Sequence, residues 1–254
     1  MRIIKSFIIA FSTYSKLPMP QFAWKEEDMK YALCFFPWVG AVIGGILYLW
    51  NLFCEKYQVG DLCYVLIGTA VPLLVTGGIH VDGFMDIMDA FHSYQPREKK
   101  LEILKDSHIG AFAVIMLAAY GLLYMGAFSQ IRNAQLFKIV CAGFFLARCL
   151  SGISVVTFPS ARKGGMLSSF ADSADKKIVK AALGLQGAAC VGFMMLQSFY
   201  AGILAAAAAL FVFAYYYYRC KKELGGITGD AAGYFVLLSE CCMLVVMAVW
   251  EALR

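Results

Sequence analysis

The sequence predicts an all-α protein, a polytopic integral membrane helix bundle with about seven spans (six to eight). Of its 254 residues, 61% are hydrophobic and only 15% are charged, whereas a soluble domain has roughly 45–50% apolar and about 25% charged residues. The mean hydropathy is +0.69. The apolar residues form long continuous runs, as in spanning helices, and lack the period-two alternation of a transmembrane β-barrel. These observations place the chain in the membrane class.

Seven apolar segments are the candidate spans, because a helix that crosses the bilayer needs about 20 mostly apolar residues. The fifth and sixth are joined almost without a polar linker, so the boundary between them is weakly defined. The first run of the chain is too short to span and lacks a cleavage site, so we expect a retained interfacial or re-entrant segment. The whole chain, 1–254, is expected to form one transmembrane domain. The candidate spans cover residues 31–53, 62–79, 109–131, 136–158, 181–199, 200–218 and 231–250.

Lysine and arginine are distributed unevenly among the loops. The N-terminal region and loops 80–108, 159–180 and 219–230 carry seventeen of them, and the loops on the other side carry four. Positively charged loops remain in the cytoplasm. We therefore expect an integral protein of a bacterial or archaeal cytoplasmic membrane, with the N-terminus and all long loops, including any catalytic ones, facing the cytoplasm. The charges form no basic stripe with aromatic residues, so no nucleic-acid partner is expected.

The stretch GGIHVDGFMDIMDAFH, after the second candidate span, contains three aspartates. Asp82, Asp86 and Asp89 are spaced i, i+4 and i+7, which places them within about 60° on one face of a helix. Like charges at this spacing repel one another, so a cation is expected beside them. It is either a set of bases folding back from Arg97–Lys105 or Mg²⁺, which prefers oxygen ligands and leaves positions for substrate phosphates. We expect Mg²⁺, with Asp230 as an additional ligand.

A second polar segment, GGITGDAAG (Gly225–Gly233), opens the last candidate span. A glycine-rich turn at a helix N-terminus offers free N–H groups and the positive end of the helix dipole, which suit a phosphate. We therefore expect Gly226, Thr228 and Gly229 to bind substrate. The alternative is that Thr228 or Asp230 is only the N-cap of the helix.

The segment LKDSHIGAF enters the third candidate span and contains Lys105 and Asp106. Lys105 is expected to hold a phosphate, and Asp106 to bind metal or act as a base. The alternative is that Asp106 or Ser107 caps the helix that follows.

Two arginines are further substrate-binding candidates. Arg162 lies in SARKGGM on the positively charged side, where it is either a phosphate clamp or simply a topology signal, because a guanidinium fork matches phosphate oxygens. Arg148 lies inside the fourth span, where burying a charge is costly, so it is expected to be functional and to pair with Glu240 of the last span.

The order of the motifs resembles one family. FSTYSKLPMP, FFPWVGAVIGG, HVDGFMDIMDAF, LEILKDSHIGAF, SARKGGM and LGGITGDAAG resemble, in this order, the sequence blocks of the cobalamin synthase family, also called adenosylcobinamide-GDP ribazoletransferase. The resemblance extends from about residue 7 to Glu240. The H-x-D-G-x-x-D-x-x-D and G-G-x-T-G-D blocks are its most specific parts. His108 stands where the family pattern usually has arginine.

The resemblance implies a transferase of the last steps of cobalamin biosynthesis. Such an enzyme joins adenosylcobinamide-GDP to alpha-ribazole, or to its 5′-phosphate, and releases GMP. Catalysis would consist mostly of positioning and charge neutralisation. The base that takes the hydroxyl proton would be Asp106 or His80, and histidine is favoured because it titrates near neutral pH. The expected partners are these substrates and membrane lipid, and a homo-oligomer or a complex with other corrinoid enzymes also fits.

Two other classes of membrane protein, diphosphate enzymes and transporters, share parts of this sequence pattern. Membrane prenyltransferases and CDP-alcohol phosphotransferases carry similar aspartate motifs, but the former would have a second acid-rich block and the latter a D-G-x-x-A-R pattern. A transporter would place charged sites near the midplane within paired repeats. The in-span residues Arg148 and Glu240 favour that reading, whereas the lack of a visible repeat disfavours it.

Overall fold

The structure is a computed structural model that describes residues 2–162 and 164–254. In these ranges the regular elements are helices, with one isolated bridge between Ser160 and Ile227. The helices are α1 (Arg2–Tyr14), α2 (Glu26–Met29), α3 (Ala32–Tyr57), α4 (Asp61–Thr76), α5 (Ile79–His92), α6 (Arg97–Ile103), α7 (Ala111–Gln130), α8 (Ala134–Thr157), α9 (Met166–Ser173), α10 (Lys176–Gln197), α11 (Phe199–Leu224) and α12 (Gly229–Ala252).

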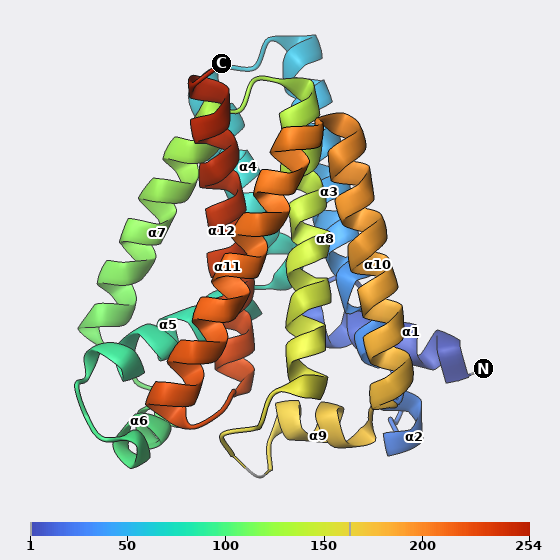
Figure 1. Ribbon diagram of the computed structural model, residues 1–254, viewed down its shortest axis with the longest axis vertical. Helices are drawn as coiled ribbons and strands as arrows, with labels where there is room; N and C mark the ends of the chain where they lie inside the picture. The colour runs from blue at the N-terminus through green and yellow to red at the C-terminus, as the bar shows by residue number, and fades with distance from the viewer. Residues whose placement is uncertain (1, 163) are drawn as a thin grey trace.

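Six helices of the described ranges are long and apolar enough to cross a membrane: α3, α7, α8, α10, α11 and α12. They run along the long axis of the molecule (Figure 1). Their bounds differ from those of the predicted spans by at most six residues. The weak boundary between the fifth and sixth spans is a single residue, Ser198. The predicted fold class, an all-α membrane helix bundle, is confirmed.

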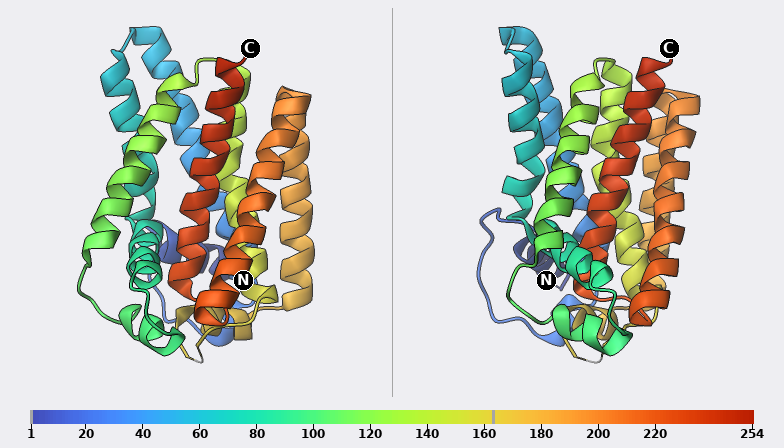
Figure 2. Two further views of the ribbon diagram at one scale, coloured as in Figure 1. Left: turned by 60° about the vertical axis from the view of Figure 1, so that its left-hand side comes forward. Right: turned by 90° about the vertical axis from the view of Figure 1, so that its left-hand side faces the viewer.

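The second predicted span differs from the expectation. Helix α4 ends at Thr76, and α5 turns away from it by 94°. The turn is made by Gly77 and Gly78, whose φ angles of 64° and 82° lie in the left-handed region that glycine adopts without steric cost. The acidic helix α5 therefore lies across the end of the bundle instead of continuing the span (Figures 1 and 2). The pair counts as a seventh span only if it is taken as one broken helix.

Small residues hold the spans together at close range. A Cβ atom on Gly40 or Gly44 of α3 would lie 2.3 Å and 2.4 Å from carbonyl oxygens of α8. Ala205 and Ala209 of α11 are fully buried, and small side chains like these let helix backbones approach. Helices α8 and α12 are the most enclosed spans.

The short helices gather at one end of the bundle. Helices α2, α5, α6 and α9 lie at the lower end in Figure 1, and the opposite end carries the turns between α3 and α4 and between α7 and α8. The lower end is the one with the positively charged loops.

Candidate functional site

Helix α5 crosses the beginning of α12 at very short range. A Cβ atom on Gly83 would lie 2.7 Å from the carbonyl oxygen of Asp230, and one on Gly233 would lie 3.2 Å from the Cα of His80. Only glycine allows this approach. As a result, the aspartates of α5 lie beside the first turn of α12.

Three carboxylates from these two helices form what we call the carboxylate cluster: Asp82, Asp86 and Asp230. Asp82 is exposed and the other two are half-buried. Burial, followed by the negative charges of Asp230 and Asp82, raises the pKa of Asp86 to about 6. No ion pair in residues 2–162 and 164–254 involves any of the three.

Asp89, the third aspartate of the predicted stripe, has a different role. Its two carboxylate oxygens accept hydrogen bonds from the backbone N–H groups of Gly110, at 2.6 Å, and Ala113, at 2.8 Å. These groups belong to the first turn of α7, which would otherwise lack acceptors. The expectation that Asp89 binds metal is corrected: it caps α7 from the side. Accordingly, the described part of the chain contains no group of three or more Asp, Glu, His or Cys side chains that could hold a metal ion without further ligands.

Two loops far apart in sequence are fastened together beside the cluster. The N–H of Ala161 donates to the carbonyl oxygen of Ile227 at 2.8 Å, and the N–H of Ile227 donates to that of Pro159 at 2.9 Å. Gly226 fits against this bridge, since a Cβ there would lie 2.5 Å from the Pro159 oxygen. The bridge holds the loop of Arg162 next to the N-terminus of α12.

The predicted phosphate cradle is only partly present. The N–H groups of Gly225 and Gly226 donate to carbonyl oxygens in the last turns of α11, so they cap that helix. The Thr228 hydroxyl accepts from the N–H of Ala231 at 3.1 Å, which confirms the alternative that Thr228 is the N-cap of α12 and corrects its substrate-binding role. Gly229 is exposed, with open space where a side chain would be, and remains accessible to a ligand.

Arg162 lies close enough to the cluster for its charge to act on two of the aspartates. Its Nη2 donates to the carbonyl oxygen of Leu101 at 2.7 Å, which fixes the guanidinium, and its charge acts on both Asp86 and Asp230. Its buried Nε has no hydrogen-bond partner in the described part of the chain. The group can therefore still donate to an anion.

Lys105 and Asp106 lie at exposed positions in the turn between α6 and α7. Asp106 accepts a hydrogen bond from the backbone N–H of His108 at 3.0 Å and shares another with its Nδ1 at 2.5 Å. The hydrogen bond with the His108 side chain lowers the pKa of Asp106. No hydrogen bond or ion pair among the described residues joins Lys105 or Asp106 to the cluster, and their expected roles in binding phosphate or metal, or as a base, stay predictions.

Arg148 pairs with Glu240, as expected, but the pair is internal. The Arg148 Nη1 donates to Glu240 Oε1 at 2.6 Å and to the carbonyl oxygen of Phe144 at 2.8 Å. The side chains are 1% and 5% exposed. These contacts join two central spans, while the buried Arg148 Nε has no hydrogen-bond partner among the described residues, so the expected role of Arg148 in substrate binding stays a prediction.

A cavity of about 300 Å³ lies beside the cluster. Asp82, Gly229 and Asp230 form part of its lining, and His80 forms another part. His80 is 5% exposed, and its Nε2 has no hydrogen-bond partner among the described residues. Burial, and then the charge of Arg148, lowers the pKa of His80 well below its ordinary value. The argument that favoured His80 as a base titrating near neutral pH is therefore wrong.

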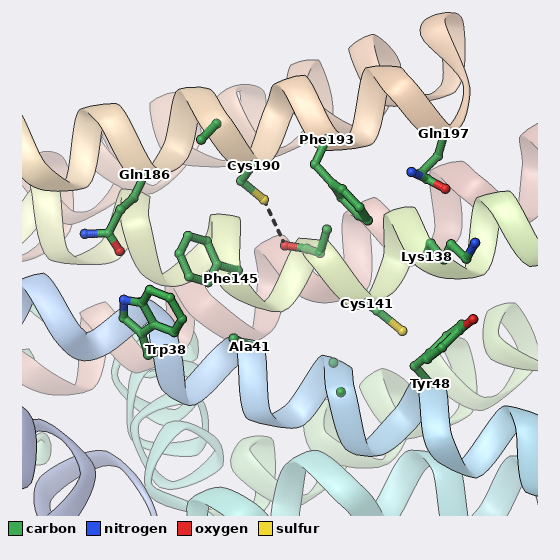
Figure 3. Close-up of a pocket in the computed structure, with 14 residues that line it drawn as sticks. Trp38, Ala41, Tyr48, Lys138, Cys141, Phe145, Gln186, Cys190, Phe193 and Gln197 are labelled. Atoms are coloured by element: carbon green, nitrogen blue, oxygen red, sulfur yellow. Dashed lines mark hydrogen bonds between the residues drawn. The ribbon is translucent and has the colours of Figure 1, made fainter.

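A larger groove of about 680 Å³ runs along α8 between α3 and α10 (Figure 3). Trp38 and Gln186 lie at one end, and Lys138 and Gln197 at the other. No aspartate or glutamate lines this groove. We therefore place the chemistry in the smaller cavity.

Two basic residues make contacts that the sequence did not indicate. Lys100 forms a largely buried ion pair with Glu223, and Arg219 lies over the ring of Phe91 with its Cζ 4.8 Å from the centroid. These contacts dock α6 and α5 onto α11. Thus Lys100, one of the bases that might have folded back onto the acidic stripe, instead pairs with α11, a contact that only the tertiary fold reveals.

Known proteins resemble this chain over nearly its whole length. The model of the cobalamin-5-phosphate synthase family matches residues 6–248. An adenosylcobinamide-GDP ribazoletransferase of Lachnoclostridium phytofermentans is 39% identical over 94% of this chain and 92% of its own. Enzymes of the same name from Clostridium perfringens and a Geobacillus species are each 28% identical, covering 96% and 91% of this chain and 98% and 90% of their own. No solved structure matches. The chain belongs to the cobalamin-5-phosphate synthase family.

Proposed function

We propose that this protein transfers the cobinamide phosphate of adenosylcobinamide-GDP to a hydroxyl of alpha-ribazole, or of its 5′-phosphate, with release of GMP. The hydroxyl oxygen forms a bond to the phosphorus next to the cobinamide, and the anhydride P–O bond breaks. GMP leaves with the bridging oxygen, and the hydroxyl gives up its proton. The names of the relatives support this reaction.

The observation that carries the proposal is the carboxylate cluster, assembled from α5 and α12 beside a cavity. Its donor set fits Mg²⁺, which takes oxygen ligands, needs only one or two carboxylates and completes its shell with water and substrate phosphates. Asp82, Asp86 and Asp230 would hold the ion, which when bound neutralises charge on the diphosphate. Because the substrate phosphates and water supply the remaining ligands, the protein does not need to provide a full set.

The chain's own residues then position the diphosphate. Arg162 presents its guanidinium next to the cluster, and Gly229 leaves the N-terminus of α12 open to an anion. A helix N-terminus favours negative charge. His80 lines the cavity with an unpartnered nitrogen, and we assign to it a hydrogen bond with the attacking hydroxyl.

The site faces the cytoplasm in this proposal. It lies at the end of the bundle that carries the long, positively charged loops, and such loops remain on the cytoplasmic side. Both substrates would then bind from the cytoplasm.

GMP release by purified protein in detergent, measured over a range of Mg²⁺ concentrations, tests the proposal. The variants Asp82→Asn, Asp86→Asn and Asp230→Asn should each lose most of the turnover. Asp172→Asn, at an exposed acid of α9 on the same end of the bundle, is the matched control and should retain it. Near wild-type turnover in all three cluster variants would remove the basis for the metal site.

A further inference from the structure

The cavity beside the carboxylate cluster has an aromatic lining. Tyr14 and Phe36 pack with ring centroids 4.2 Å apart, Tyr14 and Phe170 with centroids 5.9 Å apart, and Phe36 and His80 with centroids 5.8 Å apart. These four rings come from α1, α3, α9 and α5 and all border the cavity. Residues from four separate elements thus converge on one small space beside the cluster.

The same cavity contains a polar group without a partner. His80 Nε2 is buried and has no hydrogen-bond partner among the described residues, and the hydroxyl-bearing side chains of Tyr14 and Ser151 line the cavity beside it. Buried polar groups in proteins are normally hydrogen-bonded. A bound molecule that carries a few acceptors or hydroxyls would supply the missing partner.

The rest of the lining indicates which aromatic base the cavity would bind, the guanine of the donor or the base of the acceptor. Leu33, Val155 and Leu167 add aliphatic surface to the aromatic side chains. A guanine ring has an amino group, a ring N–H and a carbonyl at its edge, and burying these against the apolar part of the lining, away from Asp82 and Asp230, would leave them unpaired. A bicyclic aromatic base of the benzimidazole type, with few hydrogen-bonding groups, avoids this cost.

Size leads to the same choice. A cavity of about 300 Å³ is at the lower end of the range for small-molecule sites. It suits a nucleoside and is too small for a corrin macrocycle. We infer that this cavity is the acceptor subsite: the aromatic base of the ribazole stacks against Tyr14, Phe36 and Phe170, and its ribose points to the carboxylate cluster. The inference rests on the proposed function, which places phosphoryl transfer at that cluster.

The arrangement separates the two substrates. The acceptor's base enters the enclosed space behind the cluster, whereas the diphosphate of the donor lies on the solvent side, near Arg162 and Gly229. The corrinoid then stays outside the bundle, along the surface formed by the end of the spans. Loss of an aromatic side chain from the cavity should therefore weaken binding of the acceptor alone.

Binding of benzimidazole, followed by calorimetry on the full-length protein in detergent, tests the inference without turnover. In steady-state assays the base should compete with alpha-ribazole and not with adenosylcobinamide-GDP. Tyr14→Leu and Phe170→Leu should each raise the KM for alpha-ribazole roughly fivefold, since an aromatic contact of about 1 kcal/mol is lost, and leave the KM for the donor unchanged. Tyr14→Phe keeps the ring and should raise the KM for alpha-ribazole less than Tyr14→Leu does.

The controls separate the possible failures. Phe137→Leu removes a buried ring of α8 away from the cavity and should change stability without changing either KM. If benzimidazole does not bind, or if the Leu variants raise the KM for the donor instead, the acceptor assignment is overturned. These outcomes leave the reaction and the Asp→Asn results unaffected. Conversely, active Asp→Asn variants with intact benzimidazole binding would overturn the metal site and not the base site.

Discussion

Gly83 lies against the backbone of Asp230, so that the acidic helix and the last span touch where their aspartates meet. Gly83→Ala would place a methyl group 2.7 Å from the Asp230 carbonyl oxygen and must displace one of the helices. A shift of about 1 Å at a catalytic group can reduce rate on the order of 100-fold. We expect GMP release to fall by a similar factor.

Gly126→Ala is the control for this variant. Gly126 lies in α7 with open space at the position of a Cβ, and alanine is the better helix former. Its activity and melting temperature should be at least those of the wild type. Full activity of Gly83→Ala would show that the close crossing of α5 and α12 is not needed.

Removing the carboxylate of Asp89 and removing that of Asp82 should have different effects on the protein. Asp89→Ala leaves the first turn of α7 without its acceptor and should destabilise the protein by about 0.5–2 kcal/mol, the usual effect of losing a helix cap. The Mg²⁺ concentration for half-maximal activity should stay unchanged. Asp82→Ala should raise that concentration with little effect on stability. Melting curves and Mg²⁺ titrations of the two variants distinguish a cap from a ligand, and a weakened Mg²⁺ response in Asp89→Ala would restore Asp89 to the metal site.

The buried ion pair of Arg148 and Glu240 is expected to affect the stability of the folded protein. Arg148→Met leaves the buried Glu240 carboxylate without its partner and should destabilise the protein by about 3–5 kcal/mol. The double variant Arg148→Met, Glu240→Leu removes both charges and should recover most of this loss. Unfolding in detergent measures both. A double variant as unstable as the single one would mean that the contribution of Arg148 comes from its contact with Phe144 or from packing.

Arg162 and Lys105 were both expected to hold phosphate, and they differ in their surroundings: the guanidinium of Arg162 is fixed by the Leu101 carbonyl oxygen, whereas Lys105 is exposed. Arg162→Gln removes a fixed positive charge beside the cluster and should raise the KM for adenosylcobinamide-GDP about tenfold, the effect of losing a charged hydrogen bond of about 1.5 kcal/mol. The KM for alpha-ribazole should not change. Lys105→Gln, at an exposed position, should alter neither KM by more than about twofold, as is usual for a surface residue outside a site. A larger effect of Lys105 would mean that the donor reaches the loop between α6 and α7.

The spans were predictable because each depends on a local property, a long apolar run. The pairing of Arg148 with Glu240 was predictable for a similar reason, since two opposite charges inside spans have few other partners. The 94° turn between α4 and α5 was not predicted, although its glycines were visible. A glycine permits a bend, but the packing of α5 on α12 determines its direction.

The roles of single polar residues were harder to predict. Asp89 lies on the same helical face as Asp82, and nothing in the local sequence indicates that α7 begins beside it. Likewise, the local sequence does not indicate that N–H groups of the GGITGD loop donate to carbonyl oxygens in the last turns of α11. The aromatic residues Tyr14, Phe36 and Phe170 meet only in the folded chain. In each case the deciding partner comes from a distant segment.

The short α4 also affects the surrounding lipid. Its 16 residues extend about 24 Å at 1.5 Å per residue, less than the roughly 30 Å of a bilayer's hydrocarbon layer. A membrane adapts to a short helix by thinning around it. The leaflet next to α5 should therefore be depressed, so that a bulky amphiphile moving along the headgroups arrives at the level of the aspartates without leaving the interface.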